Sequence, residues 1–530
     1  MEDSDVQDYL GRPSNAIELI HDSRRNTVST FNIGHKTLSP DSQDEVDENQ
    51  DAEPEKINND ELNKTLGDII TKQLFGEKDP NEKPYEMKEG AQFFERIFHP
   101  MNYGSMRGSI FALSSMCLEA GTLVLAIRCE QFGMINYLLA IILGGIIAYS
   151  TLVMMAETGK RINKLDYSKV VNEVLGKKVG VFMDCNLSLY LFGALISFQV
   201  FIYQILGSVT YDIMKIFDKI DTEMYPTFEV FKEEYWRTKN IIKFPIMFGV
   251  IALVFPLCLL KDVSKMRYAS LFGVLALIYS IVVIVVESVF FLIYKNKDII
   301  SKMNWFNIST AFSYKEGYPF FGGLATVFYI YSCHAGAFPV YKTLRRHTSR
   351  RIRKVYRRSI LLDIIIYFSV AAASFITAPE NPPELILYRE NLDGLNPDYF
   401  VIVAKVGIIL NLFFSTPANY AGLRISLFEL IWGNSNITYC KNFFVTLITL
   451  SVVTLIGALY DKILDYIELL GGFCSVIYCF LIPGLIYVKS DPTPISFKNI
   501  LIIFMVSSLT VIGYTSGIMT ILFNMVKING

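Results

Sequence analysis

The sequence predicts an all-α polytopic membrane protein with eleven transmembrane helices. Hydrophobic residues make up 52% of the 530 positions, and the mean hydropathy of +0.35 exceeds that of soluble globular proteins. Beyond residue 105, eleven apolar segments approach the roughly 20 residues that a helix needs to cross a bilayer. Charge is also divided along the chain, because residues 1–104 hold 23 acidic and 11 basic residues, whereas the remainder has a net charge of +10.

Residues 1–90 are predicted to form a disordered, acidic, cytosolic tail. They are rich in Asp, Glu, Asn and Ser and have little apolar periodicity, so they cannot bury enough surface to offset chain entropy. We expect a solubilising or regulatory extension, with binding of a cytosolic partner as the alternative. Residues 91–104 are expected to form an interfacial segment that leads into the membrane.

The transmembrane domain is predicted over residues 105–525. Its spans are expected at residues 108–128, 131–156, 182–210, 244–260, 269–294, 321–341, 359–378, 400–418, 442–460, 466–488 and 499–525. They divide into a first set of five over about 105–295, a second set of five over about 319–488, and an extra helix over about 499–525.

Lysine and arginine predict the orientation of these spans. The connection 342–358 holds nine basic residues and no acidic one, so it is expected in the cytosol, in contact with anionic lipids rather than nucleic acid. The connection 377–399 has one arginine against five acidic residues, as expected for the opposite side. With eleven spans the N-terminus is then cytosolic, in a plasma membrane or a vacuolar or lysosomal membrane.

Two predicted spans carry signals of helix interruption. The first contains EAG at positions 119–121, and the sixth contains CHAG at positions 333–336 followed by Pro339. Membrane helices break only where they face protein or a watery cavity, and matched breaks in two halves indicate an inverted-repeat transporter with a midplane site. A break exposes N–H groups that attract a carboxylate and carbonyls that attract an ammonium or a metal ion. An amino acid carries both charges and suits such a pair.

The candidate substrate-binding residues follow from these breaks: Glu119, Ala120, Gly121, Thr122, Ser332, Cys333, His334 and Ala335. Amides around 120–122 would hold the substrate carboxylate, and carbonyls around 332–335 would hold its amine. Glu119 has three open roles: binding a proton, pairing with a cationic substrate, or a neutral structural hydrogen bond. For His334, proton sensing and a structural hydrogen bond both stay open.

The other intramembrane polar residues favour structural roles. Glu287 is expected to pack against a polar group of the bundle, and Gln199 and Gln204 are expected to bond across helices. Lys405 is expected to snorkel toward the outer face. Because no catalytic arrangement, phosphate loop or metal-ligand spacing is found, neither an enzyme nor a cofactor is expected, apart from a coupling Na⁺ or H⁺.

Motifs in predicted helices six, eight, nine and ten, in that order, resemble those of one family. The stretch SCHAGAFPVYKTL, from Ser332, is similar to the Cys-His-x-x-x-x-Pro-x-Tyr-x-x-Leu signature of the sodium-coupled neutral amino acid transporters, within the eukaryotic amino acid/auxin permease family. KVGIILNLFFSTPANYAGLRISL, from Lys405, resembles their pattern for helix eight. The Asp-bearing hairpin of helices nine and ten, which closes in Leu-Pro-Gly, resembles theirs as well. The resemblance covers about residues 105–525.

This resemblance implies the leucine-transporter fold, with a 5+5 inverted repeat plus one helix, and amino acid symport by alternating access. It also implies a sodium ion held by an Asn of helix one and a Thr of helix eight, at positions that are Ser115 and Ser415 in this chain. Because both are serines, coupling to protons through Glu119 stays open beside coupling to sodium. The alternative function is a transporter-fold nutrient receptor, or a subunit of a membrane assembly, without transport.

Overall fold

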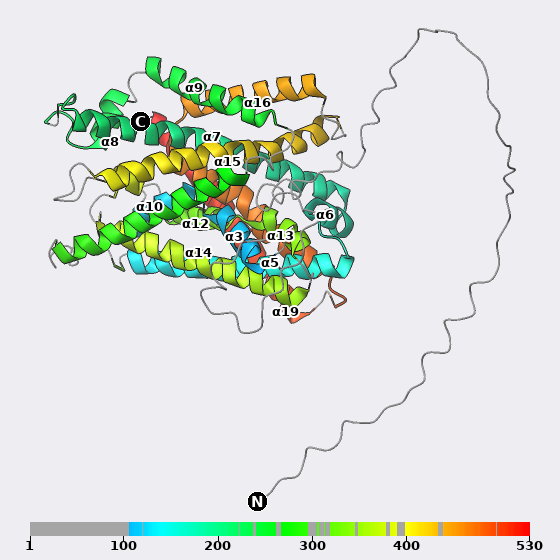
Figure 1. The fold of residues 1–530 in the computed structure, drawn as a ribbon. Helices are drawn as coiled ribbons and strands as arrows, with labels where there is room; N and C mark the ends of the chain where they lie inside the picture. Colours follow the sequence, from blue (N-terminus) through cyan, green and yellow to red (C-terminus); the bar gives the residue numbers. More distant parts are fainter. Residues whose placement is uncertain are drawn as a thin grey trace, which may run out of the picture. The chain divides into compact units, whose positions relative to one another are not determined.

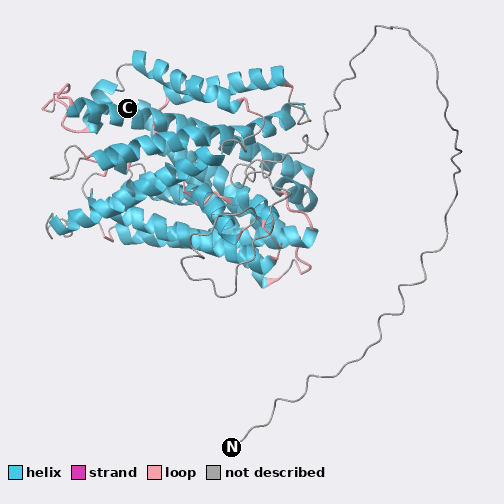
Figure 2. Cartoon of the chain, viewed as in Figure 1, coloured by secondary structure: helices cyan, strands magenta, loops and turns pink. Residues whose placement is uncertain are grey.

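The computed structural model describes residues 105–529, with gaps at 119, 222, 237–239, 261–266, 295–304, 307–311, 313–318, 345–347, 378–381, 390–397, 433–437 and 494–495. The predicted tail at 1–90 and the interfacial segment at 91–104 lie outside the described residues. Within the described ranges all regular structure is helical, as Figure 2 shows, so the all-α class is confirmed.

The described elements follow one another as helices and short 3₁₀ or π segments. They are α3 (Met106–Cys117), η2 (Ala120–Val124), α4 (Leu125–Phe132), α5 (Met134–Ile162), α6 (Tyr167–Leu175), α7 (Lys177–Ile216), α8 (Phe228–Phe231), η3 (Lys232–Trp236), α9 (Asn240–Cys258), α10 (Arg267–Tyr294), α12 (Pro319–Ile330), η6 (His334–Gly336), α13 (Ala337–Thr343), α14 (Ser349–Thr377), η7 (Ile386–Tyr388), α15 (Tyr399–Trp432), α16 (Tyr439–Leu459), α17 (Ile463–Leu469), η8 (Leu470–Leu481), α18 (Ile482–Lys489) and α19 (Phe497–Asn529).

The predicted spans match these helices in order. Among the described residues, eight helices are long and apolar enough to cross a membrane, or nine with α3 and α4 counted as one bent span. The predicted fourth span is the shorter apolar helix α9, and the sixth is divided between α12 and α13. The total of eleven spans therefore stays a prediction.

Local sequence explains where several helices begin. The Ser105 hydroxyl accepts a hydrogen bond from the Gly108 amide at 3.1 Å, which caps α3, and Asp166 caps α6 in the same way. Gly133 and Gly176 have φ values of +79° and +94°, a region that favours glycine, and they permit the sharp turns into α5 and α7.

Helix α14 packs along α3, and both α12 and α14 contact η2 at the first break. Figure 1 shows the order of these helices in the fold. Helix α14 contacts α3, α4 and α5, while α12 contacts η8 and α19. On α5, Leu139, Leu143 and Ile146 form an exposed apolar stripe at helical spacing, as expected for a surface that faces lipid. The same helix buries Tyr137 and Ile141 on its inner side.

Candidate functional site

The first predicted span is broken at the expected place. Helix α3 ends at Cys117, a 3₁₀ turn covers Ala120–Val124, and the segments Met106–Cys117 and Gly121–Phe132 are bent by 53°. Glu119 lies outside the described residues, and of Ala120 only the backbone is described. The roles predicted for the Glu119 side chain therefore stay predictions.

The sixth predicted span is broken as well. Helix α12 ends at Ile330, three non-helical residues follow, and η6 leads into α13 at Ala337. Within this break the amide of Cys333 donates to the Tyr331 carbonyl at 2.9 Å, and the amide of Gly336 donates to the Cys333 carbonyl at 3.0 Å. These short-range bonds replace the α-helical pattern, and the last turn of α12 is left with carbonyls that need other partners.

The two breaks lie against each other. A Cβ placed on Gly121 would come within 2.9 Å of Tyr329 Cδ1 and 3.0 Å of Ile330 Cγ2, so only glycine fits without a shift of its neighbours. On α14, the Tyr367 hydroxyl lies 2.7 Å from the carbonyl of Cys117 and 2.8 Å from that of Ile330. Tyr367 thus joins the carbonyl ends of both half-helices, a contact that sequence reasoning missed.

Residues near the two breaks combine hydroxyls with aromatic rings. Thr122 is buried, and its hydroxyl has no hydrogen-bond partner among the described residues. The Ser332 hydroxyl lies 2.7 Å from that of Tyr190 in α7, and its carbonyl accepts from the Tyr478 hydroxyl of η8 at 3.1 Å. The rings of Tyr190 and Tyr478 pack with centroids 5.1 Å apart. Neither tyrosine was predicted, because a tyrosine in an apolar span carries no signal of its own.

Histidine 334 makes the kind of bond expected of a structural residue. Its ring is buried, with Nε2 2.8 Å from the Thr151 hydroxyl of α5 and the ring 5.9 Å from that of Phe480. The two flanking residues that were also predicted to bind the substrate differ in burial, since Cys333 is fully buried and Ala335 is partly buried. The bond to Thr151 ties the sixth span to the second, and both roles predicted for His334 stay predictions.

The predicted sodium ligands make local bonds. The Ser115 hydroxyl donates to the Ala112 carbonyl at 2.9 Å, and the Ser415 carbonyl accepts from the Asn419 amide at 3.2 Å. Both serines are partly buried. Sodium binding by Ser115 and Ser415 stays a prediction.

Intramembrane charges are mostly paired. Glu287 forms an ion pair with Arg389, and Lys405 pairs with Asp212 at 2.5 Å. Lys405 is 3% exposed, so its predicted snorkelling is replaced by burial against a carboxylate.

The two glutamines of helix three bond across helices as expected. The Gln199 side-chain amide donates to the Met247 carbonyl at 2.6 Å, and that of Gln204 donates to the Asp461 carbonyl at 2.5 Å. Both groups tie α7 to neighbouring segments rather than to the breaks.

One buried carboxylate escaped the sequence reasoning. Asp363 lies in the middle of α14, is 0% exposed, and has no hydrogen-bond partner for either oxygen among the described residues. Its apolar context, LLDIIIYF, hid it in a hydropathy profile. The signal was present nonetheless, since any ionisable residue within a span is a functional candidate.

Polar contacts join the two halves on either side of the breaks. On the α4 side, Arg128 forms an ion pair with Glu468 of α17, and Glu468 also accepts from Thr520 of α19. Arg128 is 2% exposed, so its guanidinium group is balanced by this carboxylate rather than by water.

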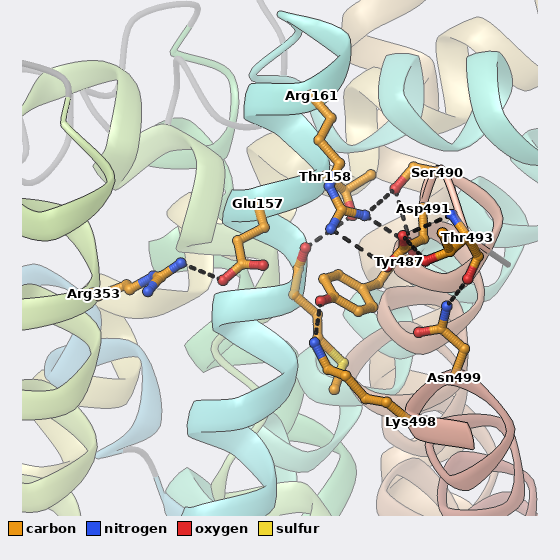
Figure 3. A network of polar contacts seen from close by, with 11 residues as sticks. Glu157, Thr158, Arg161, Arg353, Tyr487, Ser490, Asp491, Thr493, Lys498 and Asn499 are labelled. Atoms are coloured by element: carbon orange, nitrogen blue, oxygen red, sulfur yellow. Dashed lines mark hydrogen bonds and ion pairs between the residues drawn. The ribbon is translucent and has the colours of Figure 1, made fainter. Parts of the chain in front are cut away.

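On the α13 side, Figure 3 shows a network that links α5, α14, α18 and the start of α19. Arg353 pairs with Glu157, while Arg161 donates to the Tyr487 carbonyl at 3.2 Å and lies 3.7 Å from Asp491. The amide of Thr493 holds the pKa of Asp491 below its usual value. Ion pairs and hydrogen bonds thus connect the described helices on both sides of the breaks.

No group of three or more His, Cys, Asp or Glu side chains within the described ranges could hold a metal ion. The described residues at the breaks offer hydroxyls, carbonyls and amides instead. These groups suit a small zwitterion or an alkali cation better than a transition metal.

Comparisons with known proteins agree with this geometry. The sodium-coupled neutral amino acid transporter 7 of Xenopus laevis is 24% identical over 394 residues, which cover 72% of this chain and 80% of the relative. The sodium-coupled neutral amino acid symporter 2 of Danio rerio is 20% identical over 422 residues, covering 76% and 78% respectively. These named relatives are transporters rather than enzymes, as predicted.

A solved structure shares the fold. The crystal structure of MhsT in complex with L-phenylalanine matches with a TM-score of 0.50 at 13% identity, over 80% of this chain and 98% of that one. The predicted leucine-transporter-like architecture is therefore confirmed. The model of the transmembrane amino acid transporter protein family matches residues 102–525, and the chain belongs to that family.

Proposed function

We propose that the chain carries a neutral amino acid across a membrane by alternating access and holds it between the two helix breaks. The supporting observation is the contact of the breaks, in which Gly121 packs on Tyr329 and Ile330. Amides at the start of η2 would bind the substrate carboxylate, because a helix N-terminus presents free N–H groups and positive charge. Carbonyls of residues 332–335 would accept from the ammonium group.

A neutral side chain fits the described surroundings. Ser332, Tyr190 and Tyr478 bring hydroxyls and rings rather than charges to the break. The relatives quoted above are named neutral amino acid transporters. If Glu119 pairs with substrate, a cationic amino acid would be carried instead, and a comparison of alanine, glutamine and lysine uptake separates these cases.

A cation gradient would drive the transport. The relatives' names specify sodium, for which Ser115 and Ser415 are the candidate ligands, while Glu119 is the candidate for a proton. We place the chain in a plasma membrane or a vacuolar or lysosomal membrane with its N-terminal tail in the cytosol, where the tail would meet any partner.

The test uses purified protein in liposomes preloaded with unlabelled amino acid, so that exchange of labelled substrate needs no gradient. Tyr190→Phe is expected to raise KM by about 2- to 10-fold, the cost of one net hydrogen bond. Tyr279→Phe is the matched control, because its hydroxyl bonds the Phe400 carbonyl away from the breaks. Absence of exchange for every amino acid, with binding retained, would refute transport and assign a receptor role.

A further inference from the structure

Helix α14 presents a line of polar residues to the broken helices. Ser359, Asp363 and Tyr367 are spaced four apart, so they share one face of the helix. The Ser359 hydroxyl donates to the Ile110 carbonyl of α3 at 3.0 Å, and Tyr367 reaches the last carbonyls of α3 and α12. The first and third members of the line are therefore fixed to the half-helices on which the proposed substrate site is built.

The middle member of this line has no charged partner among the described residues. Asp363 is fully buried, and neither carboxyl oxygen has a hydrogen-bond partner in the described part of the chain. The Ser114 hydroxyl and the Cys117 thiol of α3 lie close enough to interact with its carboxyl group, and the Ser114 hydroxyl also donates to the Ser359 carbonyl at 3.4 Å. No lysine, arginine or histidine within the described ranges forms an ion pair with Asp363.

The titratable side chains around Asp363 are thiols and phenols, none of which can carry a positive charge. They are Cys117 of α3, Tyr331 and Cys333 of the sixth-span break, and Tyr367 of α14 itself. Glu119 lies outside the described residues. The carbonyl ends of α3 and α12 add negative partial charge beside the carboxyl group. No described side chain around Asp363 therefore carries a positive charge that could balance the carboxylate, and a cation taken up at this point would meet carbonyl oxygens and the carboxylate itself.

A proton fits this place better than a metal ion. A hard cation needs several oxygen ligands, whereas the described side chains nearest to Asp363 include two thiols and hydroxyls already engaged with carbonyls. A proton neutralises a carboxylate with a single bond and requires no coordination shell. We propose that Asp363 is the proton-binding group of this transporter and that one proton moves with each amino acid.

This inference rests on the proposed function and specifies its coupling ion. With the site open to one side, a proton from water there adds to the Asp363 carboxylate and gives a neutral carboxyl group. The amino acid binds at the breaks, and the half-helices that Ser359 and Tyr367 contact close over it. When the site opens to the other side, the carboxyl group releases the proton to water there, and the carboxylate is restored.

The experiment compares Asp363→Asn with wild type in proteoliposomes, with exchange and gradient-driven uptake measured separately. For Asp363→Asn we expect accumulation driven by a pH gradient to fall at least 10-fold, to the level without a gradient, while exchange measured in parallel reports whether the amino acid still binds and crosses. Substrate-induced change of an internal pH dye should disappear in parallel. Asp184→Asn is the matched control, because Asp184 lies on another helix, α7, and accepts a hydrogen bond from the Ser168 hydroxyl at 2.5 Å.

The other outcomes separate the two proposals. If wild type exchanges no amino acid, the proposed function fails, and this inference fails with it. If wild type exchanges but Asp363→Asn still accumulates substrate with the pH gradient, only this inference fails. Loss of pH coupling in Glu119→Gln but not in Asp363→Asn would move the proton site to Glu119.

Two further measurements test the proposal if Asp363→Asn fails to fold. Asp363→Glu keeps the acid and should retain pH-driven uptake. Wild type itself, titrated with substrate in detergent in buffers of different ionisation enthalpy, should take up close to one proton per substrate bound. Uptake of no proton by wild type, or accumulation driven by a sodium gradient alone, would overturn the assignment.

Discussion

The buried ion pair between Arg128 and Glu468 predicts a measurable barrier to opening on the α4 side. The change to make is Glu468→Gln, which keeps the shape and one acceptor but removes the charge. Removal of one partner from a buried pair costs about 3–5 kcal/mol. Because the Glu468 side chain is 13% exposed and glutamine still accepts a hydrogen bond, we expect about 2–3 kcal/mol here.

That free energy should appear as a larger open population. At a factor of ten per 1.4 kcal/mol, the population opened on the α4 side rises ~30- to ~150-fold. Cys129 of α4 provides the readout, because it is fully buried. In a Cys185→Ser/Cys440→Ser background, which removes the two exposed cysteines among the described residues, its labelling by a polar thiol reagent in detergent should accelerate by the same factor.

A charge-swapped control separates electrostatics from packing. Arg128→Glu with Glu468→Arg restores opposite charges and should slow Cys129 labelling relative to either single variant. Equal labelling rates in wild type and Glu468→Gln, under conditions where opening is faster than labelling, would refute the reasoning.

Three further predictions concern packing and pH. Gly471→Ala places a Cβ 2.0 Å from the backbone oxygen of Ala325 and should destabilise the protein by about 1–3 kcal/mol or more. The control is Gly249→Ala, whose Cβ meets nothing within 4 Å and which should leave thermal stability in detergent unchanged. Tyr367→Phe leaves terminal carbonyls of α3 and α12 without their donor and should lower the unfolding free energy by about 1–3 kcal/mol, while unchanged melting would contradict that role. The pKa of Asp491 is lowered in the folded protein, so its ionised form stabilises the fold above the normal pKa of about 3.9. This stabilisation is lost as pH falls through the lowered value. Asp491→Asn should therefore flatten acid denaturation below about pH 4.

The helical class and both helix breaks were predictable from local chemistry. The length of the apolar runs identifies the spans, and Gly121 and the CHAG segment at 333–336 predict where two of these helices are interrupted. Partners on distant helices could not be predicted, because Tyr367 and Tyr190 acquire their roles only through packing against the breaks. The π segment η8 was missed for the same reason, since its glycines matter through close contact with α12 and α19.

Asp363 illustrates a different limit. A single aspartate in an apolar run lowers the mean hydropathy too little to change the predicted span, and the sequence alone does not reveal whether a cation lies opposite. Glu287 looked equivalent in the sequence, yet it is paired with Arg389 from a distant loop. Only the fold separates a carboxylate that has a counter-ion from one that has none among the described residues.

The Tyr367 hydroxyl has a single hydrogen but stands within bonding distance of two carbonyls, one on each broken span. At any instant it donates to only one of them. If one half-helix moved away, the hydroxyl would donate to the carbonyl that stays, and only the weaker, shared interaction with the other carbonyl would be lost. Separation of one span would therefore cost less at Tyr367 than separation of both, and we expect the two breaks to move one after the other rather than together.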